Sequence, residues 1–159
     1  MDVIFYNKNH FKDGGVAEPV RDPARWTNEV FLSAAQKLTK DKNGDGKVDQ
    51  WGFTYSAATT GYYQAQHALW REGGSLYDKE KTKVTMHTDP VSVRALQAYV
   101  DIRNKYKVAP PIDIANQMGA TAMFHSGVVS MMLNANWELP NAEKARANKV
   151  IDYGAVYMP

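Results

Sequence analysis

The sequence predicts an α/β domain whose largely parallel or mixed sheet is flanked by helices. Short apolar runs typical of buried strands alternate along the chain with longer segments in which apolar residues recur at helical spacing. The 159 residues, 44% of them hydrophobic, are enough for one domain with a buried core and too few for two domains of ordinary size. No segment is repeated. We therefore expect residues 1–159 to form a single domain.

Four apolar runs are the expected strands of this sheet. They are residues 3–6, 51–56, 128–133 and 155–158, and a short hairpin is expected through residues 76–77 and 84–86. Because the first and last runs lie at the two ends of the chain, we expect a portion of a longer polypeptide, trimmed where strands cross into another domain. The alternative is a small complete protein with well-tucked termini.

The segments between the strands are the expected helices. Thr27 can cap a helix that ends at Leu38 and carries Val30 on its apolar face, together with other apolar residues at helical spacing. Glycines close several of these segments, since glycine tolerates the left-handed geometry of a helix end. Further helices are expected at residues 7–13, 61–72, 115–126 and 141–148.

A longer helix is expected after Asp89. This residue is a suitable N-cap, and Pro90 suits the first helical position because its nitrogen needs no intrahelical acceptor. An apolar face runs along the helix, formed by Val93, Leu96 and Val100 and flanked by Tyr99, Ile102 and Tyr106. Two prolines follow Ala109, so the helix should end at or before that residue.

Charge and composition exclude several classes of function. The 19 Lys and Arg stand against 17 Asp and Glu without a run of basic residues, so nucleic acid is not an expected partner. Charged groups interrupt every apolar stretch well before the roughly 20 residues needed to span a bilayer, so no direct membrane insertion is expected. The absence of cysteine excludes disulfides and thiolate metal sites.

No pattern of catalytic residues is present, and we expect that the chain is not an enzyme. The four histidines lack the i, i+4 pairing of a helical zinc site. No Gly-x-Ser-x-Gly elbow occurs, and residues 44–47 lack the upstream glycine and the Ser or Thr of a phosphate-binding loop. Nothing marks a pair of acids for glycoside hydrolysis.

An Asp-rich segment matches the first part of an EF-hand loop. Side-chain oxygens occupy its positions 1, 3, 5 and 9, a backbone carbonyl occupies position 7, and glycine stands at position 6. The twelfth position is Gly52 instead of the bidentate Glu that completes calcium coordination. We expect that no cofactor is required and that calcium is a possible ligand of this segment. The alternative is a polar turn in which the Asp and Asn side chains accept backbone N–H groups. The candidate metal residues are Asp41, Asn43, Asp45, Lys47 and Asp49.

Aromatic and amide side chains follow two of the predicted strands. In α/β sheets, ligands bind in the crevice beyond the carboxyl ends of strands, which is where these residues should lie. Sugars suit such surroundings, because their C–H faces stack on aromatic rings and their hydroxyls need amide and hydroxyl partners. Core packing is the alternative, and we accept it for Trp70. The candidate ligand-binding residues are Tyr62, Tyr63, Gln66, Asn134, Asn136 and Trp137.

Short motifs follow one another along the chain in a specific order. They are Phe5-Tyr6-Asn7-Lys8, Phe11, Trp26-Thr27-Asn28-Glu29, Leu38-Thr39, Asp45-Gly46-Lys47, Trp51-Gly52-Phe53, Trp70, Gly73-Gly74, Met123-Phe124, Ser126-Gly127, Met131-Met132 and Trp137. Each motif alone is weak, but their order and spacing along nearly the whole chain are specific. In this succession the chain resembles family 1 extracellular solute-binding proteins.

The resemblance implies a periplasmic-binding-protein-like type II fold with two lobes, in which residues 1–159 form most of the second lobe. It also implies a carbohydrate-binding role in an ABC importer, with a sugar or oligosaccharide and the importer's membrane subunits as partners. The location would be periplasmic or extracellular, and the parent protein could be anchored to a membrane. By position, Tyr63 and Trp137 would stack on the sugar. Relatives often have glycine before that tryptophan, where residues 134–136 read Asn-Ala-Asn.

Overall fold

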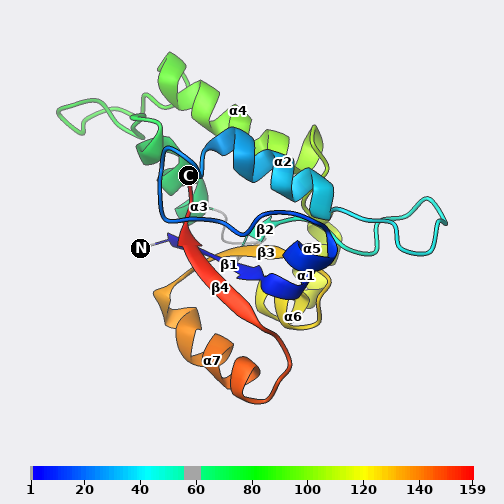
Figure 1. Ribbon diagram of the computed structural model, residues 1–159. Helices are drawn as coiled ribbons and strands as arrows, with labels where there is room; N and C mark the ends of the chain where they lie inside the picture. The colour runs from blue at the N-terminus through cyan, green and yellow to red at the C-terminus, as the bar shows by residue number, and fades with distance from the viewer. Residues whose placement is uncertain (1, 56–61) are drawn as a thin grey trace. The chain divides into compact units, whose positions relative to one another are not determined.

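The computed structural model describes residues 2–55 and 62–159, except for the side chains of Asp2, Tyr62 and Tyr63. The chain forms two compact units, and each is described here by itself. The first unit comprises Met1–Ala58 and Val108–Pro159, and the second comprises Thr59–Lys107. Figure 1 shows the elements of both.

The first unit is built on a four-stranded sheet in the order β2-β3-β1-β4. Its central strand β1 (Asp2–Asn7) pairs antiparallel with β3 (Met131–Ala135) on one side and with β4 (Tyr153–Tyr157) on the other. The short strand β2 (Thr54–Tyr55) pairs with β3 in parallel. The sheet is therefore mixed, as the sequence predicts, with one parallel pair among its described strands.

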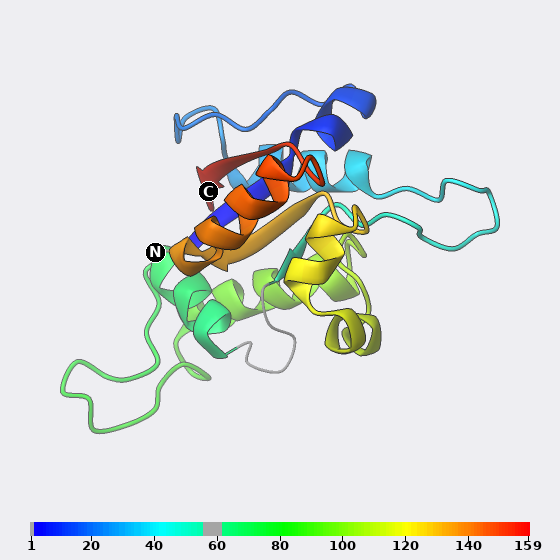
Figure 2. The same ribbon diagram turned by 90° about the horizontal axis from the view of Figure 1, so that it is seen from below.

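One face of the sheet packs against three helices. Side chains alternate between the two faces of a strand, so Phe5, Met132 and Ala155, which are partners in register, share this face. They belong to one apolar cluster with residues of α5 (Ile112–Met118), α6 (Ala120–His125) and α7 (Leu139–Ala147). Figure 2, seen from the side of α6 and α7, shows these two helices lying across the strands.

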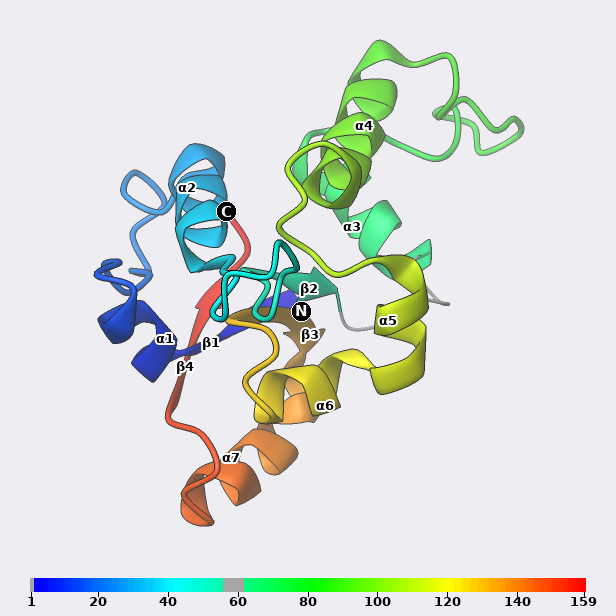
Figure 3. The same cartoon turned by 90° about the vertical axis from the view of Figure 1, so that its right-hand side faces the viewer.

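The opposite face carries a row of aromatic rings. The helix α2 (Asn28–Leu38), which Thr27 caps as expected, lies on the other side of the sheet from α6 and α7 (Figures 1 and 3). The rings of Phe31 and Phe53 meet edge to face with centroids 5.0 Å apart, and Tyr55 extends the row at the same distance from Phe53. Such edge-to-face pairs are favoured by the ring quadrupoles.

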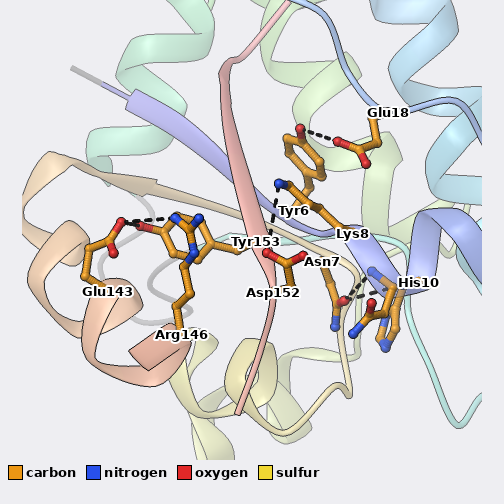
Figure 4. A network of polar contacts seen from close by, with 10 residues as sticks. Tyr6, Asn7, Lys8, His10, Glu18, Glu143, Arg146, Asp152 and Tyr153 are labelled. Carbon is orange, nitrogen blue, oxygen red and sulfur yellow. Dashed lines mark hydrogen bonds and ion pairs between the residues drawn. The ribbon is translucent and has the colours of Figure 1, made fainter. Parts of the chain in front are cut away.

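Polar side chains tie the loops around β1 and β4 to the sheet (Figure 4). The hydroxyl of Tyr6 donates to a carboxylate oxygen of Glu18 at 2.9 Å, and burial together with that carboxylate raises the pKa of Tyr6 to about 12. Asn7 ends β1 and caps the following helix α1 (Lys8–Asp13), where its Oδ1 accepts the backbone N–H of His10. Lys8 forms an ion pair with Asp152 at 3.9 Å.

The second unit contains α3 (Tyr62–Arg71), α4 (Pro90–Asn104) and the segment between them. Asp89 caps α4 and accepts the N–H of Ser92 at 2.9 Å, as the sequence predicts. The predicted apolar face of α4 is confirmed only in part, because Ile102 is buried whereas Val93 and Val100 are exposed. Ser92, which was not expected there, is fully buried. Ser92 is small, and its Oγ accepts the N–H of Ser75 at 3.0 Å, so this face lies against the segment that follows α3.

Several predicted bounds differ from those of the structure. The helix expected at residues 115–126 is two helices, α5 and α6, because Gly119 lies between them with a φ of 73° that ends the first. The expected hairpin through residues 76–77 and 84–86 is reduced to one bridge between Tyr77 and Val84. The apolar face predicted for α2 is confirmed except at Val30, which is exposed; its buried residues are Phe31, Ala34, Ala35 and Leu38.

A side chain at position 52 would disrupt the close approach of two backbone segments. A Cβ built on Gly52 would lie 2.6 Å from the Cα of Ala35 in α2, and closer still to the carbonyl oxygen of Ala35. We expect Gly52→Ala to lower the free energy of unfolding by about 3 kcal/mol or more, since overpacking of backbone atoms has no side-chain rotamer to relieve it. Chemical denaturation measures this loss.

Gly15→Ala is the matched control for this substitution. Gly15 has a φ of 61° and no atom within 4 Å of a built Cβ, so only backbone strain of about 1–2 kcal/mol is expected. An equal loss in the two variants would contradict the role assigned to close packing at Gly52.

Candidate functional site

The carboxyl ends of β2 and β3 define one edge of the sheet in the first unit. Because Thr54 pairs with Met132 and Tyr55 with Leu133 in parallel, the chain leaves both strands at the same edge. The loop expected after Ser56 lies outside the described residues. The residues that follow β3 are described, and they form the candidate site.

Trp137 projects from a short turn directly after β3. It lies in η1 (Asn136–Glu138), a single 3-10 turn, and its side chain is 70% exposed. Asn136 beside it is exposed as well. A tryptophan in solvent leaves a large apolar surface in water, so the alternative of core packing does not hold for Trp137. An exposed ring next to an exposed amide offers a stacking surface and a hydrogen-bonding group to a ligand.

Asn134 lies in the same region but is buried, with 6% of its surface exposed. Its Nδ2 donates to Oε2 of Glu138 at 3.2 Å, and its Oδ1 accepts the N–H of Ala135 at 2.9 Å. Its amide is therefore already used within the chain. Ligand binding by Asn134 stays a prediction.

Glu138 is the site residue that the sequence reasoning missed. It follows Trp137 directly, yet only 3% of its surface is exposed. The hydroxyl of Thr121 in α6 donates to its Oε2 at 3.1 Å, and Nε2 of His125 lies 3.9 Å from its Oε1. Among the described residues, neither that Nε2 nor that Oε1 has a hydrogen-bond partner. No periodic pattern marks Glu138 in the sequence, because its burial depends on contacts with a distant helix.

The second group of candidate residues belongs to the second unit. Tyr62 and Tyr63 begin α3, and their side chains lie outside the described part of the structure. Gln66 is half-buried on the same helix. The expectation that Trp70 packs in a core is wrong, since its side chain is 54% exposed and its ring lies 5.5 Å from that of His67. That these residues bind a ligand stays a prediction.

The Asp-rich segment is an exposed turn held together by its own side chains. The carboxylate of Asp41 accepts the N–H of Gly44 at 2.7 Å and of Gly46 at 2.8 Å, and both glycines have the left-handed φ that the turn requires. These hydrogen bonds, that of Gly46 foremost, hold the pKa of Asp41 below its usual value. Asn43 and Asp45 each accept the N–H two residues further on.

The remaining candidate calcium ligands are Asp49 and Lys47, of which Asp49 also accepts a backbone N–H of the turn. Asp49 accepts the N–H of Lys42 at 2.7 Å, which closes the turn, and Lys47 is exposed. No three His, Asp or Glu side chains of the described residues are grouped so that they could hold a metal ion. The geometry is that of a polar turn, and calcium binding stays a prediction.

Comparison with known proteins addresses the chain as a whole. A model of the family of bacterial extracellular solute-binding proteins matches residues 1–159. No curated protein sequence gives a significant match. In the described part of the chain, none of the helices is long and apolar enough to cross a membrane.

Solved structures of substrate-binding and solute-binding proteins share the fold of the chain. An ABC substrate-binding protein, Lmo0181 from Listeria monocytogenes in complex with cycloalternan, is 25% identical with a TM-score of 0.79, covering 97% of this chain and 36% of its own. The maltotriose-bound MalE domain from Bdellovibrio bacteriovorus is 20% identical with a TM-score of 0.73, covering 99% and 36%. A tagatose-bound solute-binding protein from Thermotoga lettingae is 24% identical with a TM-score of 0.75, covering 99% and 39%.

These matches settle the fold class and the family. The chain has the α/β fold of part of a periplasmic binding protein, and it spans little more than a third of the length of the structures it matches. Proteins of this family are solute-binding components of transport systems and not enzymes, which agrees with the absence of catalytic motifs. The chain belongs to the family of bacterial extracellular solute-binding proteins.

Proposed function

We propose that the chain is a carbohydrate-binding part of an ABC importer's solute-binding protein and forms most of its second lobe. The observation that carries this proposal is the 70% exposed Trp137 at the sheet edge where β2 and β3 end. A flat apolar ring beside the exposed amide of Asn136 suits a sugar, which has both C–H faces and hydroxyls. Relatives that share the fold were solved with cycloalternan, maltotriose and tagatose, which supports the same class of ligand.

The proposed mechanism is binding without chemistry. One lobe holds the sugar by stacking and hydrogen bonds, the other lobe closes over it by hinge motion, and the closed form docks on the importer's membrane subunits outside the cytoplasm. Tyr62, Tyr63 and Gln66 of the second unit remain candidate ligand-binding residues. If a complete site binds at micromolar strength, about 8 kcal/mol, and each lobe supplies half, this chain alone binds near millimolar.

The proposal predicts that a sugar contacts Trp137. Titration of the chain with maltotriose, followed by the indole N–H signals in NMR spectra, should shift the signal of Trp137 with a dissociation constant near millimolar. Trp137→Ala should weaken binding roughly tenfold, because the stacking surface is removed.

Tyr77→Ala is the matched control for Trp137→Ala. It removes another exposed aromatic side chain that is not among the candidate ligand residues, so binding should be unchanged. Tight binding of maltotriose to the chain alone would contradict the half-site account, and equal binding by Trp137→Ala and the original chain would contradict the role of Trp137.

A calcium-dependent interaction module built on residues 41–49 is the alternative function. It has less support, because the side-chain oxygens of Asp41, Asn43, Asp45 and Asp49 accept backbone N–H groups of the same turn. We expect the turn to form without metal. Excess chelator should therefore leave the melting temperature unchanged, whereas a fall in that temperature together with heat in a calcium titration would favour the module.

The hydrogen bonds of Asp41 predict how the turn responds to pH. Because the pKa of Asp41 is lowered in the folded chain, the stability that its carboxylate contributes is complete above the ordinary pKa of about 3.9. It is lost as the pH falls through the lowered value. The amide signal of Gly46 in NMR spectra should titrate at that lowered pH, and Asp41→Asn should abolish this titration. A midpoint at or above the ordinary pKa would contradict the assignment.

A further inference from the structure

Trp137 and Glu138 are neighbours in one turn and have opposite environments. The indole is 70% exposed, whereas the carboxylate side chain beside it is 3% exposed. Burying a carboxylate is unfavourable unless donors replace the water that it loses. The contacts of Glu138 therefore constrain how the turn that carries Trp137 can be arranged.

Two donors from different elements hold the carboxylate. Thr121 of α6 donates to Oε2 at 3.1 Å, and Asn134 of β3 donates to the same oxygen at 3.2 Å. The other oxygen faces the ring of His125, also on α6, at 3.9 Å. Glu138 thus connects the turn to both a helix and a strand of the first unit.

The position of Glu138 in the chain shows that this arrangement is not ordinary helix capping. Glu138 stands at the N-cap of α7, where a side-chain oxygen would normally accept a backbone N–H of the first helical turn, but it makes no such hydrogen bond. The turn η1 also lacks a side-chain cap at Ala135. In the described part of the chain, the hydrogen bonds of the Glu138 side chain are those to Thr121 and Asn134, and they connect this turn with α6 and β3.

We propose that Glu138 is a positioning residue that fixes the turn η1 and so holds Trp137 in place for a ligand. This inference rests on the proposed function and deepens it. A ring whose backbone is already fixed loses less conformational freedom when the ligand binds, so binding is tighter than to a mobile ring. Glu138 itself does not contact the ligand, because its carboxylate is buried.

Three variants of the full chain test the proposal through the backbone mobility of Trp137, measured by 15N relaxation without ligand. Glu138→Leu removes both hydrogen bonds, so the order parameter of the Trp137 amide should fall from about 0.85 to below about 0.6. Glu138→Gln keeps an acceptor oxygen for Thr121 and Asn134, so it should restore the rigid value. Thr121→Val removes one donor with little change of shape and should give a smaller fall.

Glu143→Leu is the matched control, since it removes a carboxylate of α7 that contacts Tyr153 and not η1. It should leave the Trp137 amide rigid. Titration with maltotriose should show a roughly threefold to tenfold weaker affinity for Glu138→Leu than for Glu138→Gln.

Unchanged mobility of Trp137 in both Glu138→Leu and Thr121→Val would overturn the proposal, and Thr121→Val decides alone if Glu138→Leu does not fold. Increased mobility in these variants, but not in Glu138→Gln or Glu143→Leu, supports it. If this pattern appears and the original chain does not bind maltotriose or other sugars, the positioning of the turn stands and the proposed sugar-binding function fails.

Discussion

The pairing of β1 with strands on both of its sides is the constraint on which the first unit depends. Its register assigns Phe5 to the face covered by α5, α6 and α7, and Ile4 to the opposite face. A slip of one residue would exchange the side chains between two apolar faces that are both buried and differently packed, so the fit of Ile4 and Phe5 to their own faces fixes the register. The neighbouring strand β4 has glycine at position 154, where any Cβ would overlap the ring of Tyr6.

The same sheet determines where Trp137, the proposed ligand-stacking residue, lies. Because β2 pairs with β3 in parallel, the chain leaves both strands at the same edge of the sheet. The first turn beyond β3 carries Trp137. Because α6 packs on β3, Thr121 of α6 lies within hydrogen-bonding distance of Glu138. The position of the exposed ring therefore follows from strand register and helix packing together, and not from the local sequence of the turn alone.

Most elements of the fold could be predicted from the sequence, because caps and apolar runs act locally. Thr27 and Asp89 begin their helices through hydrogen bonds to nearby N–H groups, which a sequence reveals. The break at Gly119 and the exposure of Val93 could not be predicted, since they depend on backbone geometry and on the neighbour that a helix meets. Glu138 was missed for the same reason: its donors lie in α6 and at the end of β3.

The turn η1 departs from the usual burial preferences in two ways at once. It leaves the indole of Trp137 in water and takes the carboxylate of Glu138 out of water, and both arrangements are unfavourable for folding by themselves. Local conflicts of this kind are expected at functional sites, where stability gives way to binding. The Asp-rich turn shows no such conflict, because its exposed carboxylates accept nearby backbone N–H groups. This contrast supports the proposed role of η1 over a role of the Asp-rich turn.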